Sequence, residues 1–212
     1  MKVLVACEYS GRVRSAFREI GHDAWSCDLL ASEDDSKFHI IGDVMQLLRQ
    51  QWDLVIAHPP CTYLTCSAEW AYGPGPYHQK VKPSTLTGDD RRAARLDAID
   101  FVLAIWNCSA PRVCIENPVG VLSAHLGRPN VVQPYEHGDD ASKKTCLWLR
   151  GLMHITPTQM VAPRMVIGKP RWANQTDSGQ NNLSPNTDRW KERSRTYAGI
   201  ASAMASQWGN IE

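Results

Sequence analysis

A short apolar run that ends in two prolines constrains this chain of 212 residues most strongly. The run Asp53-Leu54-Val55-Ile56-Ala57 is typical of a buried strand, and His58-Pro59-Pro60-Cys61 follows it directly. Because proline lacks a backbone N–H and fixes φ, it continues neither a helix nor a central strand. We therefore expect Cys61 on a stiff turn at the carboxyl end of a strand, where ligands bind in open α/β sheets.

A second apolar run has the same design. Arg112-Val113-Cys114-Ile115 is expected to form a strand that ends at Glu116-Asn117-Pro118. The two runs present a thiol and a carboxyl at strand ends. Burial beside so apolar a strand predicts a raised pKa for Glu116, which would make it a proton donor near neutral pH. Pairing of Glu116 with a neighbouring Lys or Arg is an equally good interpretation.

Strand-like and helix-like segments alternate along the chain. This order predicts an α/β fold, a Rossmann-like doubly wound, mostly parallel sheet with helices on both faces. Ser10 is expected to cap the first helix. The expected strands are 2–6, 23–28, 39–43, 52–57, 112–115, 131–133 and 145–149, and the expected helices are 13–20, 44–51, 89–107, 119–126 and 194–208. The long helix is expected to bury Ala93, Leu96, Ile99, Val102, Leu103 and Trp106 on one face.

Two long segments lack periodicity. Residues 62–89 form an expected loop that could close as a lid, because structureless loops of this length are usually functional or disordered. Residues 159–193 are polar and loop-like, with Trp, Arg and Asn interspersed. We therefore expect a catalytic domain at 1–150, a reduced loop-rich recognition region at 151–193, and a closing helix at 194–212 that packs back on the catalytic domain.

Composition excludes several classes of protein. No stretch approaches the roughly 20 apolar residues of a membrane span, and Glu8 and Arg12 interrupt the apolar N-terminus, so neither a membrane partner nor a signal peptide is expected. Seven cysteines without Cys-x-x-Cys pairs favour a reducing, cytoplasmic setting and no metal site. From Lys143 onward, ten Lys or Arg stand against four Asp or Glu. This imbalance is compatible with a nucleic-acid partner.

Two acids are placed for a nucleoside cofactor. Asp28 ends a predicted strand where such folds bind ribose hydroxyls, and Asp43 ends the next, where it could accept from an adenine amine. The first loop carries Gly11 alone instead of a glycine-rich phosphate fingerprint, and Glu8 would repel a pyrophosphate. S-adenosylmethionine therefore fits better than a dinucleotide. Simple capping of helices or strand ends is an equally good interpretation of Asp28 and of Asp43.

Cys61 could be a nucleophile or a packing residue. A thiolate needs a partly exposed, electropositive site, which Lys143 could help to provide. Buried structural cysteines are commoner, but the proline turn favours a nucleophile. His58 could be the base of a Cys–His hydrolase, but no orienting partner is evident, and we expect a surface or turn histidine. The other cysteines are expected to be packing residues: Cys7, Cys27, Cys66, Cys108, Cys114 and Cys146.

Together these motifs resemble the cytosine-5 DNA methyltransferases, in particular short phage or prophage members. Pro59-Pro60-Cys61 and Glu116-Asn117-Pro118 resemble the family's Pro-Cys and Glu-Asn motifs, Lys143-Lys144-Thr145 its Arg-rich motif, and Tyr197-Ala198-Gly199-Ile200 its last motif. The resemblance implies that Cys61, Glu116, Asn117 and Lys143 are catalytic. It also implies that S-adenosyl-L-methionine is bound by Ala6, Cys7, Glu8, Tyr9, Ser10, Gly11, Asp28, Leu29, Asp43, Val44, Pro59 and Tyr197.

The implied reaction is methyl transfer to C5 of cytosine in DNA. Cys61 would attack C6, Glu116 would hydrogen-bond N3 and the amine, Asn117 would orient neighbouring backbone and Lys143 would approach O2. The cytosine would be flipped out or single-stranded. The family's recognition domain is reduced to about 45 residues here, which leaves the target sequence open. Candidates for phosphate contact are Lys80, Lys82, Arg91, Arg92, Lys169, Arg171, Lys191 and Arg193.

Two further interpretations are compatible with the sequence. The same cysteine chemistry could act on a free pyrimidine nucleotide, or the chain could be a non-catalytic nucleic-acid-binding relative. As a phage or prophage enzyme it would act in the cytoplasm of a bacterial host. The sequence does not indicate an oligomeric state.

Overall fold

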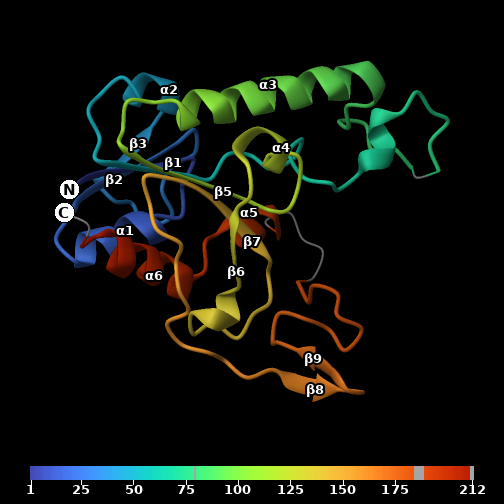
Figure 1. Cartoon of the computed structure of the whole chain (residues 1–212). Helices are drawn as coiled ribbons and strands as arrows, with labels where there is room; N and C mark the ends of the chain where they lie inside the picture. The colour runs from blue at the N-terminus through green and yellow to red at the C-terminus, as the bar shows by residue number, and fades with distance from the viewer. Residues whose placement is uncertain (79, 184–188, 211–212) are drawn as a thin grey trace.

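A seven-stranded sheet organises the chain, with the strand order β3-β2-β1-β4-β5-β7-β6 (Figure 1). The computed structural model describes residues 1–78, 80–183 and 189–210. The strands β3, β2, β1, β4 and β5 run parallel, whereas β7 is antiparallel to both β5 and β6. The strands are β1 (Lys2–Ala6), β2 (Asp23–Asp28), β3 (His39–Ile41), β4 (Leu54–Ala57), β5 (Arg112–Asn117), β6 (Asn130–Val132) and β7 (Thr145–Arg150).

The chain reverses its direction of winding between β1 and β4. From β1 the strands progress through β2 to β3 on one side, and from β4 to β5 on the other. In open α/β sheets this switch point leaves a crevice at the carboxyl ends of the strands. The fold class predicted from the sequence, a doubly wound and mostly parallel α/β sheet, is confirmed.

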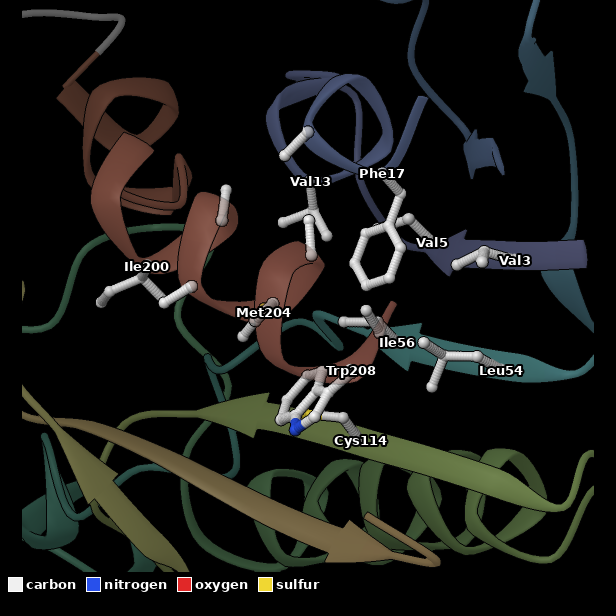
Figure 2. Packing of buried hydrophobic residues seen from close by; sticks show 14 of the residues in the cluster. Val3, Val5, Val13, Phe17, Leu54, Ile56, Cys114, Ile200, Met204 and Trp208 are labelled. Carbon is white, nitrogen blue, oxygen red and sulfur yellow. The ribbon is translucent and has the colours of Figure 1, made fainter. Parts of the chain in front are cut away.

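Helices cover both faces of the sheet (Figure 1). They are α1 (Arg12–Glu19), α2 (Val44–Leu47), α3 (Gly88–Trp106), α4 (Ser123–Leu126), α5 (Arg189–Ser194) and α6 (Ala198–Trp208), with 3₁₀ turns η1 (Glu69–Tyr72) and η2 (Pro134–Glu136). Helices α1 and α6 pack on one face, where Phe17, Met204 and Trp208 meet the inward residues of β1, β4 and β5 (Figure 2). On the other face α3 contributes Ile99, Val102 and Ile105 to a second core.

The central strands β1 and β4 are buried on both sides. All four residues of β4 are buried, as expected for a central parallel strand covered by helices on both faces. Full burial of each large apolar side chain contributes about 1.5–3 kcal/mol. The positions of the strand ends are therefore fixed by packing on both faces, which is the property that a site at those ends requires.

Several element boundaries differ from the sequence expectations. The helix expected at 44–51 is the single turn α2, and the helix expected at 119–126 begins only at Ser123. The helix expected at 194–208 begins only at Ala198, as α6, and a separate helix, α5, ends at Ser194. The polar segment 159–193 is not only loop, because it contains a hairpin of β8 (Arg164–Val166) and β9 (Lys169–Arg171). Parts of the expected lid, recognition region and closing helix, namely residues 79, 184–188 and 211–212, lie outside the described residues.

Two details of helix burial also correct the expectations. Leu96 of α3 is 62% exposed, whereas Arg91, which was not expected in the core, is 5% exposed. Ser10 does not cap α1. The N-cap is Gly11, with φ of 70°, and the carboxylate of Glu8 accepts the N–H groups of Val13 and Arg14 at 2.7 and 3.2 Å.

The loop after Cys61 is joined to the loop after Glu116. The backbone N–H of Val121 donates to the carbonyl of Leu64 at 2.9 Å, and Thr65 forms an antiparallel bridge with Gly120. A Cβ atom built on Gly120 would lie 1.9 Å from the Leu64 carbonyl oxygen. The two loops therefore approach so closely that only glycine fits at position 120.

We expect Gly120→Ala to separate these loops and destabilise the protein. Relief of the clash must move backbone, which typically costs about 1–3 kcal/mol. Thermal unfolding would measure the loss. Gly73→Ala is the matched control, because a Cβ at Gly73 makes only an ordinary contact at 3.7 Å. Equal unfolding midpoints for Gly120→Ala and the native chain would contradict this account of the loop junction.

Candidate active site

The carboxyl ends of β4 and β5 bring the two sequence motifs to one cavity. These strands pair in parallel, with Ala57 opposite Ile115, so that the residues following them emerge at the same edge of the sheet. A cavity of about 640 Å³ lies there, which we call the Cys61 cavity. The four residues expected to be catalytic all line it: Cys61, Glu116, Asn117 and Lys143.

Glu116 is paired with a histidine. Its Oε2 atom accepts a hydrogen bond from Nδ1 of His58 at 3.1 Å, and the two side chains are only 15% and 8% exposed. His58 lies in the turn after β4, as one of the two expectations had it, but its buried side chain contradicts the other, a surface histidine. It lies within the hydrogen-bonded core of the site because β4 delivers it beside the end of β5.

The pKa of Glu116 is lowered, not raised as the apolar strand suggested. Burial by itself raises this pKa, but the hydrogen bond from His58 and the positive charge of Lys143 outweigh that effect. For His58, burial lowers the pKa, and the hydrogen bond and charge of Glu116, aided by Glu8, raise it above the ordinary value. At pH values between the lowered pKa of Glu116 and the raised pKa of His58, the pair is an imidazolium and a carboxylate.

The thiol of Cys61 is held in its protonated form. Withdrawal of the sulfur from solvent and the charge of Glu116 both raise its pKa, while Lys143 opposes them. Cys61 is nevertheless exposed at the cavity wall and is open to a reactant. Positive charge brought near the sulfur would lower this pKa, so activation of the thiol has to accompany ligand binding. Cys66, expected to be a packing residue, is also exposed.

Asn117 joins the two strand ends. Its Nδ2 atom donates to the carbonyl oxygen of Pro59 at 2.8 Å, and the residue is 1% exposed. This bond holds the diproline turn that presents Cys61. A buried amide bonded in this way supports the expectation that Asn117 orients neighbouring backbone, and its catalytic role remains a prediction.

Helix α5 borders the Cys61 cavity. Trp190, Arg193 and Ser194 line the cavity together with Lys143, whose Nζ donates to the Arg193 carbonyl at 2.9 Å. The hydroxyl of Tyr9 donates to the Lys191 carbonyl at 2.8 Å. Tyr9, which the resemblance assigns to the cofactor, therefore anchors α5 in this structure.

A second cavity, of about 600 Å³, lies at the switch point of the sheet and is called here the switch-point cavity. Six of the residues expected to bind the cofactor line it: Cys7, Asp28, Leu29, Asp43, Val44 and Pro59. They come from the ends of β1, β2, β3 and β4. Pro59, Pro60 and Thr62 line both cavities, so the diproline turn is the wall between them.

The switch-point cavity carries negative charge. Burial and the charges of Asp28 and Asp43 raise the pKa of the Cys7 thiol to about 12. Both acids also cap backbone: Asp28 accepts from the N–H of Leu30 at 3.0 Å, and Asp43 from that of Met45 at 2.9 Å. The capping interpretation and the ligand-binding interpretation are thus compatible, because capping fixes each carboxylate at the cavity wall.

The remaining residues expected to bind the cofactor do not line this cavity. Ala6 and Glu8 are buried, Ser10 and Gly11 border a groove between α1 and α6, and Tyr197 borders a polar cavity beside Arg12. Sequence reasoning also missed Tyr63, Asp97 and Phe101, which do line it. Asp97 and Phe101 are one turn apart on α3, and this helical spacing was the available signal.

Few of the candidate phosphate contacts lie at the Cys61 cavity. Arg91 and Arg193 line it, whereas Arg92 lies outside it and pairs with Asp89 at the surface. Lys169 and Arg171 are on the β8–β9 hairpin. Within the described residues, no group of three His, Cys, Asp or Glu side chains could hold a metal ion. The helices of that same part of the chain are too short or too polar to cross a bilayer.

We expect His58→Asn to destabilise the fold in a pH-dependent way. Because the pKa of His58 is raised in the folded protein, His58 contributes fully to the free energy of unfolding below its ordinary pKa of 6.5. That contribution is lost as pH rises through the raised pKa. Because the pKa of Glu116 is lowered in the folded protein, Glu116 contributes fully to the free energy of unfolding above its ordinary pKa of 4.5. That contribution is lost as pH falls through the lowered pKa. The loss of unfolding free energy should therefore be largest between about pH 4.5 and 6.5, at about 3 kcal/mol.

Urea unfolding across the pH range would measure this difference. His154→Asn is the control, because His154 is exposed. A destabilisation by His58→Asn that does not vary with pH would contradict the ionic description of the pair.

Comparisons with known proteins give little further guidance. No family model matches the chain, and no curated protein matches it. Among solved structures, the chain is similar to an E. coli protein encoded within a prophage and proposed to be a DNA modification methyltransferase. The identity is 11%, the TM-score is 0.45, and the match covers 75% of this chain and 51% of that one. The chain thus spans about half the length of that protein, and we draw no functional conclusion from the similarity.

Proposed function

We propose that this protein transfers a methyl group from S-adenosylmethionine to C5 of a cytosine in DNA, through a transient bond between Sγ of Cys61 and C6 of the ring. One observation carries the proposal. Cys61 and Glu116 line one cavity, and the turn that presents Cys61 is also the wall of a second cavity with acidic strand ends. A nucleophile, an acid and a nucleoside-sized cleft therefore adjoin one another.

The switch-point cavity suits a cationic nucleoside cofactor. Asp28 and Asp43 offer carboxylates to hydroxyl and amine groups, and Phe101 and Tyr63 offer aromatic surface to a base. The negative charge that raises the pKa of Cys7 favours a positively charged ligand. The N–H groups at the start of α1, where a dinucleotide would place its pyrophosphate, are occupied by Glu8.

When bound, S-adenosylmethionine supplies an electrophilic methyl group on a positively charged sulfur. The residues of the Cys61 cavity prepare the acceptor. Attack of Sγ on C6, with loss of the thiol proton, makes C5 electron-rich enough to take the methyl group. Loss of the C5 proton and cleavage of the Sγ–C6 bond then restore the aromatic ring. One of the two released protons returns to Sγ and restores the thiol. The other leaves to solvent and balances the positive charge that the cofactor sulfur loses.

The charges around Glu116 match this chemistry. As a carboxylate it accepts a hydrogen bond from the exocyclic amine of cytosine. Negative charge that develops on the ring during attack is offset by the imidazolium of His58 and by Lys143. Asn117 keeps Cys61 in position through its bond to Pro59. A base within a duplex would have to leave the stack to reach this cavity.

We expect Cys61→Ala to abolish methyl transfer to DNA. No other group of the cavity can form the bond to C6, so the loss should reach background. Transfer of labelled methyl groups from S-adenosylmethionine to mixed-sequence DNA would measure it. Cys66→Ala is a closely matched control, since Cys66 is also exposed and lies on the same loop, and it should retain activity.

A trapping experiment tests the covalent step separately. Fluorine at C5 cannot leave as a proton after methyl transfer, so in the presence of S-adenosylmethionine DNA containing 5-fluorocytosine should remain attached to the native chain and to Cys66→Ala. Mass spectrometry of the digested adduct should locate the link at Cys61. Methyl transfer that persists in Cys61→Ala would refute the proposed mechanism.

We expect Asp28→Asn to weaken S-adenosylmethionine binding. Loss of one charged hydrogen-bond acceptor should reduce the affinity about tenfold to a hundredfold. Calorimetry with the cofactor alone would measure this change without requiring turnover. Asp35→Asn provides the control, because Asp35 is exposed and does not line the switch-point cavity. Equal affinities of Asp28→Asn and the native chain would remove Asp28 from the cofactor site.

A further inference from the structure

We infer that Arg91 forms a phosphate subsite within the Cys61 cavity, which binds a phosphate of the nucleotide whose base lies against Cys61. The inference rests on the proposed function for the identity of that base. In the proposed function, Cys61 and the Glu116 pair contact the base of the nucleotide. The inference assigns Arg91 to a different group of the substrate, its phosphate.

The burial of Arg91 is the first observation. This residue lies in the first turns of α3, is 5% exposed and lines the cavity together with Cys61, Thr65 and Ser67. Its guanidinium lies 5.3 Å from the ring centre of Tyr63 and 4.8 Å from that of Tyr72. The two rings fix its position. A buried guanidinium with a fixed position at a cavity wall is preorganised to bind an anion.

The absence of a countercharge is the second observation. Arg91 Nη1 donates to the Leu86 carbonyl at 3.3 Å, its buried Nε has no hydrogen-bond partner, and no carboxylate within the described ranges forms an ion pair with it. Arg14, the other arginine buried in those ranges, pairs with Asp34. A buried charge without a partner is costly, so an anion is required to complete the site.

Two neighbouring arginines of α3 do have acidic partners. Arg92 pairs with Asp89, and Arg95 pairs with Glu69 at 2.6 Å although it stacks on the same Tyr72 ring. Of these three arginines of α3, Arg91 is the one that lines the Cys61 cavity, and it has no acidic partner among the described residues. Stacking between tyrosines would by itself account for the position of Arg91, but it does not account for the unpaired Nε.

Phosphate is the anion that fits both the residue and the location. The planar fork of an arginine binds phosphate oxygens in pairs, and every nucleotide carries a phosphate within reach of its base. The cavity, at about 640 Å³, has room for a nucleotide as well as its base. Lys143 acts on Glu116, at the end of the cavity proposed for the base, so Arg91 is not needed there as a counterion.

The ratio of two affinities tests the subsite. Deoxycytidine and its monophosphate, dCMP, differ only by the phosphate, and calorimetry gives both affinities at one ionic strength. The native chain should bind dCMP about tenfold more tightly or better, and Arg91→Gln should reduce that preference to about twofold or less while it binds deoxycytidine normally. Arg92→Gln, which lies outside the cavity, should keep the full preference.

Two further measurements separate a binding role from a structural one. Arg91→Lys keeps the charge but loses the fork and should show an intermediate preference. Addition of dCMP should raise the unfolding midpoint of the native chain more than that of either variant. A full preference for dCMP in Arg91→Gln, or none in the native chain, would overturn the subsite. A loss of affinity that is equal for deoxycytidine and dCMP would also overturn it, in favour of a structural role.

A single-stranded oligo(dC) identifies the source of the phosphate. If the oligonucleotide binds more tightly than dCMP and depends on Arg91, the phosphate belongs to a DNA strand. If dCMP binds more tightly, it belongs to a free nucleotide. None of these measurements needs methyl transfer. Failure of the transfer assay would therefore refute the proposed reaction, whereas only the affinities decide whether the phosphate subsite exists.

Discussion

The parallel pairing of β4 with β5 is the constraint on which the site depends. It places the residue after Ala57 beside the residue after Ile115, and every later contact of the Cys61 cavity follows from that register. The bond from Asn117 to the Pro59 carbonyl and the junction of Leu64 with Val121 then fix the two emerging loops to each other. A reactive centre needs such support on both sides, because displacements of about 1 Å reduce catalysis strongly.

The electrostatics of the two cavities are complementary. The switch-point cavity is acidic, whereas the Cys61 cavity contains His58, Lys143 and Arg91 around a single carboxylate. The diproline turn between them carries no side-chain charge. The opposite charges on the two sides of this turn would direct a cationic cofactor to one cavity and an anionic substrate to the other, with their reacting atoms adjacent at the turn. Burial of the sulfur and the charge of Glu116 raise the pKa of the Cys61 thiol in spite of these cations.

Sequence reasoning located the strands of the large sheet, Cys61 and Glu116 because these depend on local patterns, whereas Asn117 and Lys143 were assigned through the family resemblance. Apolar runs mark buried strands, and the residues directly after them share a sheet edge. It left the charge state of Glu116 open between a protonated acid and a carboxylate paired with a Lys or Arg, and it did not identify His58 as the partner. That state depends on His58, which is 58 positions away in the chain and adjacent only after β4 and β5 pair. Similarly, the burial of Arg91 depends on Tyr63 and Tyr72, from a loop without periodicity.

Local sequence patterns predicted least well the positions where burial of a charged or polar group reduces the stability of the fold. Glu8, His58, Arg91 and Glu116 are charged or polar groups withdrawn from water, and an interior chosen only for stability would replace them with apolar side chains. Glu8 is compensated by the helix N–H groups, and Glu116 and His58 compensate each other. Arg91 is compensated by no acid of the described chain. An uncompensated group is therefore the clearest sign of where a ligand completes the structure.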